Sequence, residues 1–184
     1  MSNVILASAS PRRQELLKNI FEEFEIMPAD IDESVDDSIA VEERPELIAR
    51  KKAEHIAKDH PDSLVIGCDT AVIADGEMLG KPSDRADAER MLRMLSGREH
   101  KVITGCCLCR NGAEKSFSVT TIVRFYELTD DEIERYLLTD EWRDKAGAYG
   151  IQGAAGLFAE GIIGDYNNVV GLPCARLNRE VRSI

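Results

Sequence analysis

A group of hydroxyl and guanidinium side chains near the amino terminus has the composition of an anion site. The segment Ser8-Ala9-Ser10-Pro11-Arg12-Arg13 separates an apolar run from an amphipathic one. Serine as N-cap and proline at the first helical position predict that a helix begins here. Two arginines in the first helical turn interact unfavourably with the positive end of the helix dipole. An anion bound at this helix end would remove that unfavourable interaction. The pattern indicates a phosphate-binding segment, with two solvated arginines as the alternative.

A carboxylate interrupts an apolar stretch in the first half of the chain. The segment Gly67-Cys68-Asp69-Thr70 lies within residues 64–73, which have the composition of a strand. Burying a carboxylate is costly unless it is paired or binds a metal. An aspartate on a rigid strand can hold Mg²⁺ or orient an attacking water. Asp69 is therefore a candidate metal ligand or base, and a hydrogen-bonded structural aspartate is the alternative.

A segment rich in glycine, Gly76-Glu77-Met78-Leu79-Gly80-Lys81-Pro82, imitates a phosphate-binding P-loop but departs from it twice. Its glycines are too close together, and Pro82 stands where the P-loop has its Mg²⁺-binding Ser or Thr. We therefore reject a P-loop. Asp75-Gly76 instead indicates a hairpin turn. Lys81 on the far arm of that hairpin is a candidate phosphate ligand, with a solvated lysine as the alternative.

Weaker signals come from charged segments. Asp30, Asp32 and Glu33 offer oxygen ligands, although an acidic run is usually a solvated loop. Lys51 and Lys52 lie on a predicted helix, where surface charge is the expected interpretation. The three histidines are scattered without metal-ligand spacing, and no Ser/His/Asp or Cys/His arrangement favours acyl chemistry.

These residues need a scaffold in which strands alternate with helices. Strands are predicted at residues 4–7, 64–73, 77–79, 101–109 and 117–125, and the last two form a hairpin about Asn111-Gly112. Helices are predicted to start at Ser10-Pro11, to span 42–58 and 83–95, to start from a capping box at Thr129 and to follow Pro173. Seven of the thirteen glycines lie between Gly147 and Gly171, which predicts tight turns rather than regular helix there. The alternation predicts an α/β fold, a mixed sheet with flanking helices, in one domain over residues 1–184.

Composition excludes several classes of function. The 184 residues include 23 Lys and Arg against 34 Asp and Glu, a net charge of −11, which argues against broad nucleic-acid binding and a polybasic membrane surface. Five cysteines are an odd number, and the one Cys-x-x-Cys spacing, Cys106 to Cys109, has no second pair to complete a ligand set, so a disulfide framework or a zinc site is unexpected; Cys107 and Cys109 are expected to pack as small apolar groups. No signal peptide or membrane span is evident, so we expect a soluble, cytoplasmic protein.

Taken together, these segments resemble the Maf family over about residues 4–182. The resemblance is carried, in chain order, by residues 8–13, Asp32-Glu33, Lys52, residues 67–70, Gly80-Lys81-Pro82, Leu95-Ser96-Gly97, residues 145–153 and Gly171-Leu172-Pro173. It implies an ITPase-like fold with two closely packed lobes around a cleft. It also implies that the protein is a nucleoside triphosphate pyrophosphatase. Whether two copies form a homodimer is left open by the resemblance.

The resemblance implies hydrolysis between the α- and β-phosphates, helped by a divalent cation such as Mg²⁺, Mn²⁺ or Co²⁺. Asp69 matches the family's base, and Glu33 is a candidate to share the metal or the water. The matching phosphate-facing side chains are Arg13, Lys52 and Lys81, with Ser8 and Ser10 in the phosphate-binding segment.

Two branches of the family differ in the base they prefer, which is a pyrimidine (dTTP and UTP) or 7-methylguanine (7-methyl-GTP). Arg12, Thr70 and Gln152 match the dTTP/UTP branch, and the Gln152 amide can pair with a pyrimidine edge. Alternatively, Gln152 only ties down its glycine-rich loop. The resemblance thus implies a house-cleaning enzyme for dTTP, UTP and modified pyrimidine triphosphates. A 7-methyl-GTP pyrophosphatase and a non-catalytic nucleotide-binding regulator of cell division are the alternatives.

Overall fold

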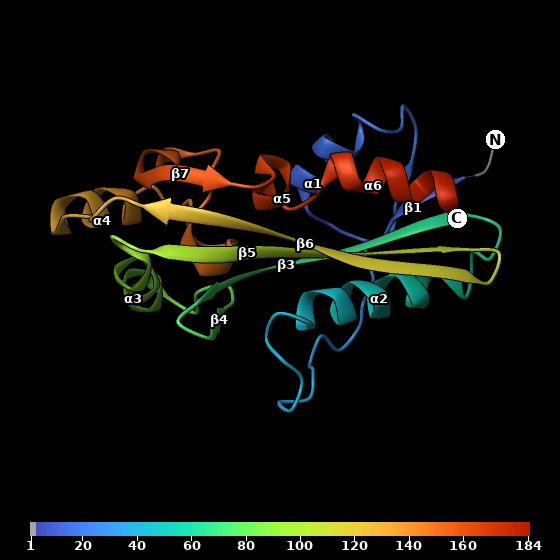
Figure 1. The fold of residues 1–184 in the computed structure, drawn as a ribbon, viewed down its shortest axis with the longest axis horizontal. Helices are drawn as coiled ribbons and strands as arrows, with labels where there is room; N and C mark the ends of the chain where they lie inside the picture. Colours follow the sequence, from blue (N-terminus) through green and yellow to red (C-terminus); the bar gives the residue numbers. More distant parts are fainter. Residues whose placement is uncertain (1–2) are drawn as a thin grey trace. The chain divides into compact units, whose positions relative to one another are not determined.

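The computed structural model describes residues 3–184, which form one mixed sheet and its helices (Figure 1). The strands are β1 (Val4–Leu6), β2 (Glu25–Ile26), β3 (Leu64–Ala74), β4 (Glu77–Leu79), β5 (Glu99–Arg110), β6 (Ala113–Phe125) and β7 (Ala159–Ile163). The α-helices are α1 (Pro11–Leu17), α2 (Arg44–Ala57), α3 (Arg85–Leu95), α4 (Asp130–Leu137), α5 (Tyr166–Val170) and α6 (Cys174–Glu180). Short 3₁₀ helices are η1 (Ala146–Ala148), η2 (Ala154–Phe158) and η3 (Val181–Ser183). The strand order is β2-β1-β3-β5-β6-β7, with β4 paired to β3, which confirms the predicted α/β class.

Both predicted hairpins are present. β3 and β4 pair antiparallel, with Val72 opposite Leu79. In the first turn the φ angles are 50° at Asp75 and 78° at Gly76. In the second turn they are 51° at Asn111 and 78° at Gly112. Positive φ at both central residues is what a type I′ hairpin turn requires, and Asp-Gly and Asn-Gly adopt it readily.

The described chain forms two compact units. The first unit contains the described residues up to Thr70, together with Thr104–Val119 and Gly171–Ile184. The second unit contains Ala71–Ile103 and Thr120–Val170. The strands β3, β5 and β6 therefore contribute residues to both units.

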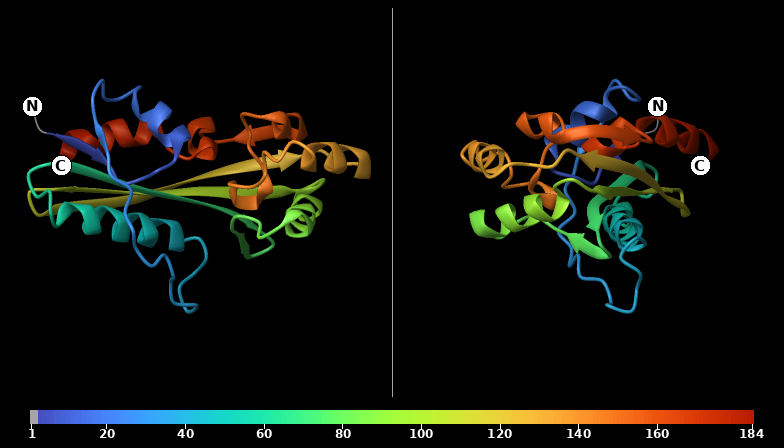
Figure 2. Two further views of the ribbon diagram at one scale, coloured as in Figure 1. Left: turned by 180° about the vertical axis from the view of Figure 1, so that it is seen from behind. Right: turned by 60° about the vertical axis from the view of Figure 1, so that its left-hand side comes forward.

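In the first unit, helices cover both faces of the strands. On one face, Leu6 and Ile66 pack in a cluster with Leu17 of α1, and α6 contributes to the same cluster. On the other face, Ile5 packs in a cluster with Ala53 of α2. The views in Figures 1 and 2 show α2 on one side of these strands and α1 and α6 on the other. Burial on both faces explains why the parallel strands β1 and β3 have nearly continuous apolar sequences.

The core of the second unit is rich in aromatic rings. Phe125 packs edge-on against His100, Tyr149 and Phe158, with ring centroids 4.9, 4.9 and 6.0 Å away. The His100 Nε2 and Tyr149 Oη atoms are 2.8 Å apart, which gives two polar atoms of this core a partner. α3 and α4 close this core, and α4 begins with the predicted capping box between Thr129 and Glu132.

The prediction for the glycine-rich segment was wrong in part, because it contains the strand β7 and the helix α5. β7 forms because it pairs antiparallel with β6, where Ile122 lies opposite Ile163, and this ladder outweighs the weak local propensity. α5 forms where the Asp165 carboxylate accepts a hydrogen bond of 2.8 Å from the Asn167 backbone N–H. The two-residue strand β2 was also not predicted. Among the helices of residues 3–184, we find none with the length and hydrophobicity to cross a membrane.

Candidate functional site

The close approach of α2 to β3 depends on Gly67. A Cβ atom at this position would lie 2.1 Å from the Ala49 carbonyl oxygen and 2.8 Å from the Ala53 nitrogen. Real Cβ atoms do not come so close to backbone atoms, so glycine is what permits this packing. The same approach brings Lys52, the neighbour of Ala53, beside Asp69, two residues after Gly67.

Lys52 joins two carboxylates. Its Nζ lies 2.9 Å from Asp69 Oδ1 and 2.9 Å from Glu33 Oε1. Lys52 is only 8% exposed, so the prediction of a surface charge was wrong. Asp69 is largely buried, whereas the Glu33 side chain is half exposed. A buried ammonium between two carboxylates fixes the direction of both, because leaving it without a partner would be costly.

The acidic loop before α2 is shaped by side chains other than Glu33. Both Asp32 oxygens accept hydrogen bonds from Ser34, one from its N–H at 2.8 Å and one from its hydroxyl at 2.7 Å. These hydrogen bonds lower the pKa of the Asp32 carboxyl. Lys51 Nζ donates to the Ser34 carbonyl oxygen at 2.6 Å and so ties the loop to α2. Asp32 and Lys51 therefore hold the loop that carries Glu33, a role the sequence did not reveal for Lys51.

Arg13 is held by three neutral oxygen atoms. Its Nε donates to the Gly171 carbonyl at 2.9 Å, its Nη1 to Ser8 Oγ at 3.2 Å and its Nη2 to Thr70 Oγ1 at 2.9 Å. Gly171 has a φ of 126°, which favours glycine and turns its carbonyl toward the guanidinium. Within residues 3–184, no carboxylate pairs with Arg13, so its positive charge is positioned and left without an anion.

The serines predicted for the anion site do meet Arg13. Ser10 is the N-cap of α1, and its Oγ accepts from the Arg13 backbone N–H at 3.5 Å. Ser8 is nearly buried, and its Oγ also accepts from the Ser10 N–H at 3.3 Å. Arg12 is half-buried beside Arg13 on the first turn of α1.

Asp69 and Thr70 connect the two groups of charged side chains, because they are consecutive residues of β3. Thr70 accepts from Arg13 and shares a 2.9 Å hydrogen bond with the hydroxyl of the fully buried Thr104 on β5. No sequence pattern singled out Thr104. The first unit therefore contains two groups, one of Ser8, Ser10, Arg13 and Thr70 and one of Glu33, Lys52 and Asp69, which are joined through consecutive residues of β3.

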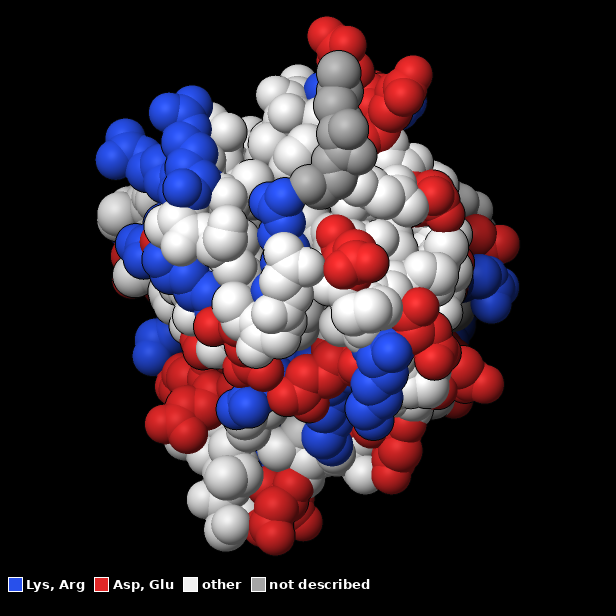
Figure 3. Space-filling model, turned by 90° about the vertical axis from the view of Figure 1, so that its right-hand side faces the viewer, with Lys and Arg blue, Asp and Glu red and all other residues white. Residues whose placement is uncertain are grey.

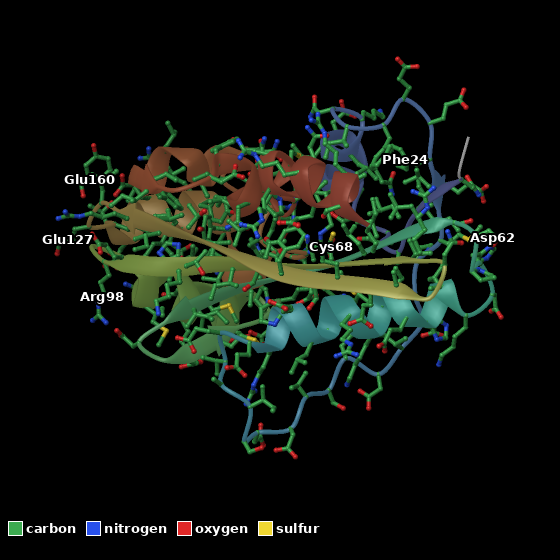
Figure 4. The ribbon with its side chains drawn as sticks, turned by 45° about the vertical axis from the view of Figure 1, so that its right-hand side comes forward. Phe24, Asp62, Cys68, Arg98, Glu127 and Glu160 are labelled. Carbon is green, nitrogen blue, oxygen red and sulfur yellow. The ribbon has the colours of Figure 1, made fainter. Side chains whose placement is uncertain are left out.

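Cys68, which precedes Asp69, lies in the interior of the first unit (Figure 4). Its Sγ is 3.8 Å from Cys106 Sγ, and that hydrogen bond lowers the pKa of the Cys68 thiol. All five cysteines are free and buried. Because successive strand residues point to opposite faces, a buried Cys68 leaves Asp69 on the α2 side.

Lys81 and Gln152 belong to the second unit, and both are exposed. In the described part of the chain, neither side chain has a hydrogen bond or an ion pair. The glycine-rich loop is held instead by Glu141, whose Oε2 accepts from the Ala154 N–H at 3.0 Å. Lys145 Nζ in turn donates to the Glu141 carbonyl at 2.9 Å. Gln152 therefore does not tie down the loop, and Glu141, which the sequence did not single out, does.

The donor atoms of the first unit suit a hard divalent cation. Asp69 and Glu33 offer carboxylate oxygens, which are the ligands that Mg²⁺ and Mn²⁺ prefer. On the face seen in Figure 3, basic side chains are interspersed with acidic ones.

Comparisons with known proteins cover nearly the whole chain. The family model described as Maf-like protein matches residues 3–184. A dTTP/UTP pyrophosphatase of Geobacillus sp. (strain WCH70) is 46% identical over 184 residues, covering 100% of this chain and 99% of the relative. A dTTP/UTP pyrophosphatase of Carboxydothermus hydrogenoformans is 50% identical over 181 residues, covering 97% of each.

Solved structures with low sequence identity share the fold. A HAM1 protein from Coxiella burnetii has a TM-score of 0.60 at 14% identity, with 100% of both chains covered. The Ham1 protein of Staphylococcus aureus has a TM-score of 0.59 at 14% identity, with 99% of both chains covered. These similarities confirm the expected ITPase-like α/β fold.

Proposed function

The chain belongs to the Maf family, and on this basis we propose that it hydrolyses dTTP and UTP to the nucleoside monophosphate and pyrophosphate. Relatives named dTTP/UTP pyrophosphatase match it over nearly their whole length, so almost all of their sequence has a counterpart here. The chain also carries the charged residues that such a reaction needs.

One observation carries the proposal: the Lys52 ammonium contacts both Asp69 and Glu33 at 2.9 Å. A triphosphate is highly anionic, and its hydrolysis needs a carboxylate base held in place among cations. Lys52 provides that arrangement. Arg13 of α1 adds a second cation, because it donates a hydrogen bond to Thr70, the residue that follows Asp69 on β3.

Each residue then has a role in the reaction. Asp69 accepts a proton from the water that attacks the α-phosphorus, while the bond from that phosphorus to the α,β-bridging oxygen breaks. The water oxygen stays on the monophosphate, and the bridging oxygen leaves with pyrophosphate. Lys52 orients Asp69 for this proton transfer. Arg13 binds phosphate oxygens, helped by the hydroxyls of Ser8 and Ser10.

We assign the cofactor to the carboxylates of Asp69 and Glu33, which fit Mg²⁺, Mn²⁺ or Co²⁺ as oxygen donors. When bound there, such an ion would neutralise triphosphate charge and favour the departure of pyrophosphate. Both carboxylates already share Lys52, so the chain itself sets their direction.

Base choice is assigned to Gln152, with Arg12 and Thr70 as further specificity residues and Lys81 as a phosphate-binding lysine. Gln152 supports this role because its amide is exposed and is not used within the described chain. An unused amide can donate to and accept from the edge of a pyrimidine.

The experiment is to identify the products from dTTP, UTP, GTP and 7-methyl-GTP with Mg²⁺, Mn²⁺ or Co²⁺, with and without excess EDTA. We expect monophosphate and pyrophosphate, fastest from dTTP and UTP, and no turnover with EDTA. Release of orthophosphate would contradict hydrolysis at the α-phosphorus. Faster turnover of 7-methyl-GTP would assign the chain to the sister branch. Tight nucleotide binding without turnover would indicate a regulator.

A further inference from the structure

A second group of metal-ligating side chains in the first unit takes no part in the proposed reaction. Cys107 and Cys109 lie on one face of β5, because alternate residues of a strand share a face. Their Sγ atoms are 3.9 Å apart. Glu114 follows on β6, across the Asn111-Gly112 turn, and brings a carboxylate oxygen. The three ligand atoms lie within 4.8 Å of one another, and the rest of the described chain has no comparable group.

The spacing of the two sulfurs matches a tetrahedral zinc site. With Zn–S bonds of about 2.3 Å, tetrahedral geometry places two thiolates about 3.8 Å apart. The observed 3.9 Å therefore requires almost no movement of β5. We propose that Cys107, Cys109 and Glu114 bind a thiophilic divalent ion of the Zn²⁺ type, distinct from the oxygen-bound ion assigned to Asp69 and Glu33.

The charges around Glu114 also favour a cation. A single atom, Arg50 Nε, serves two carboxylates, with Glu114 Oε1 at 2.9 Å and Glu54 Oε1 at 3.0 Å. One positive charge is thus shared between two acids, and a bound ion would supply the second. Arg50 can keep one oxygen of Glu114 while the other binds the ion, as carboxylate ligands in proteins often do.

The proposed ligands become less buried toward Glu114, and they are separate from Lys52, which orients Asp69. Cys107 is 0% exposed, Cys109 is 6% exposed and the Glu114 side chain is 30% exposed, so burial decreases toward Glu114. Arg50 and Lys52 both lie on α2, but residues two apart on a helix do not share a face. We therefore expect a bound ion to stabilise the first unit without replacing the ion used in hydrolysis.

The spacing in the sequence concealed this group. A Cys-x-Cys pair lacks the two-residue spacer of common zinc motifs, and these cysteines were expected to pack as apolar groups. The third ligand comes from the neighbouring strand. Its proximity depends on the two-residue hairpin turn, which a pattern of cysteines alone does not report.

The test uses Co²⁺ as a spectroscopic substitute for Zn²⁺ on the metal-stripped, reduced full chain. We expect a thiolate-to-cobalt charge-transfer band that saturates at one ion per chain and is abolished by Zn²⁺ but not by Mg²⁺. Zn²⁺ should also raise the Tm. Asp69 and Glu33 cannot produce this band, because it requires sulfur ligands.

Three variants locate the ligands. The double variant Cys107→Ser/Cys109→Ser should lose both the band and the Zn²⁺-induced rise in Tm, with Mg²⁺-supported hydrolysis retained. Cys174→Ser, a change at another buried cysteine of the first unit, should keep the band. If the double variant does not fold, Glu114→Gln decides, because it should weaken Co²⁺ binding by about tenfold or more. Absence of the band in the wild type, or its persistence in a folded double variant, would overturn the proposal.

Discussion

Lys52 and Asp69 form a 2.9 Å hydrogen bond, although 17 residues separate them in the sequence. The bond joins α2 to β3, and Lys52 is almost completely buried there. Because Lys52 also contacts Glu33, one side chain sets the directions of both proposed metal-binding carboxylates. This relationship depends on how closely the helix lies on the strand, and thus on Gly67.

Gly67→Ala tests that dependence. The new Cβ would meet the Ala49 carbonyl oxygen and the Ala53 nitrogen, which cannot rotate away as a flexible side chain could. We expect the free energy of unfolding to fall by about 3 kcal/mol, the upper end for overpacking. Gly161→Ala is the control, because nothing lies within 4 Å of its added Cβ, and it should change stability by less than about 1 kcal/mol. Equal urea unfolding curves for the two variants would contradict the packing argument.

Arg13→Ala should impair the hydrolysis of every triphosphate alike, since phosphates are common to all of them. The loss of charged hydrogen bonds predicts a fall in kcat/KM of about 10- to 100-fold for dTTP, UTP and GTP. Arg13→Lys should restore only part of the activity, because lysine keeps the charge but lacks the planar fork. Arg135→Ala, at an exposed arginine of α4, is the control and should have no effect. A fall confined to one base would remove Arg13 from phosphate binding.

Gln152→Leu should lower kcat/KM for dTTP and UTP by about 1–3 kcal/mol, the cost of an unsatisfied hydrogen-bond partner. Turnover of GTP should change much less, and the Tm should stay the same, because the exposed side chain makes no hydrogen bond within residues 3–184. Glu141→Gln is the matched comparison. This change weakens the hydrogen bond to the Ala154 N–H and loosens the loop, so kcat/KM should fall by a similar factor for all substrates. Equal losses for dTTP and GTP in Gln152→Leu would end the base-recognition assignment.

Much of the fold could be predicted from local signals. The Ser10 and Thr129 caps and the turns Asp75-Gly76 and Asn111-Gly112 depend on residues close together in the chain, and the structure contains all four. β7 was missed because it forms by pairing with β6, a distant partner whose hydrogen bonds outweigh the unfavourable strand propensity of Gly161. The expected interpretation of Lys52 as surface charge failed for the same reason, since its burial depends on β3.

The residues of the candidate site also fall into those that sequence patterns indicated and those that only the folded structure reveals. Asp69 stood out because a carboxylate within an apolar strand is costly, and Arg13 because it lies in a predicted first helical turn. Glu33 was a weaker candidate in an acidic run, and the resemblance to the family added Gln152. Thr104, Lys51 and Glu141 gave no local signal. Their importance comes from single hydrogen bonds to Thr70, Ser34 and Ala154, which only the folded chain brings within reach.

His100 predicts a pH dependence of stability. Burial lowers its pKa to about 4, from 6.5 in the unfolded chain. Between these values the unfolded state binds the proton and the folded state does not, so stability falls as the pH drops from 6.5 toward 4. The loss amounts to about 3 kcal/mol in this window. His100→Gln, which does not titrate, should show a correspondingly smaller difference between urea unfolding at about pH 7 and about pH 4.5. Identical differences for both proteins would contradict a neutral, buried His100.

The proposed hydrolysis of a nucleoside triphosphate requires Asp69 to take the proton from the attacking water. The most direct measurement is the initial rate of pyrophosphate release from dTTP by Asp69→Asn, together with its Tm. The amide has nearly the same size but accepts no proton, and Glu33 still gives Lys52 a carboxylate partner, so the fold should survive. We expect a rate about two to four orders of magnitude below the wild type, the range for a lost general base, at a Tm close to that of the wild type. A wild-type rate in the folded variant would contradict it.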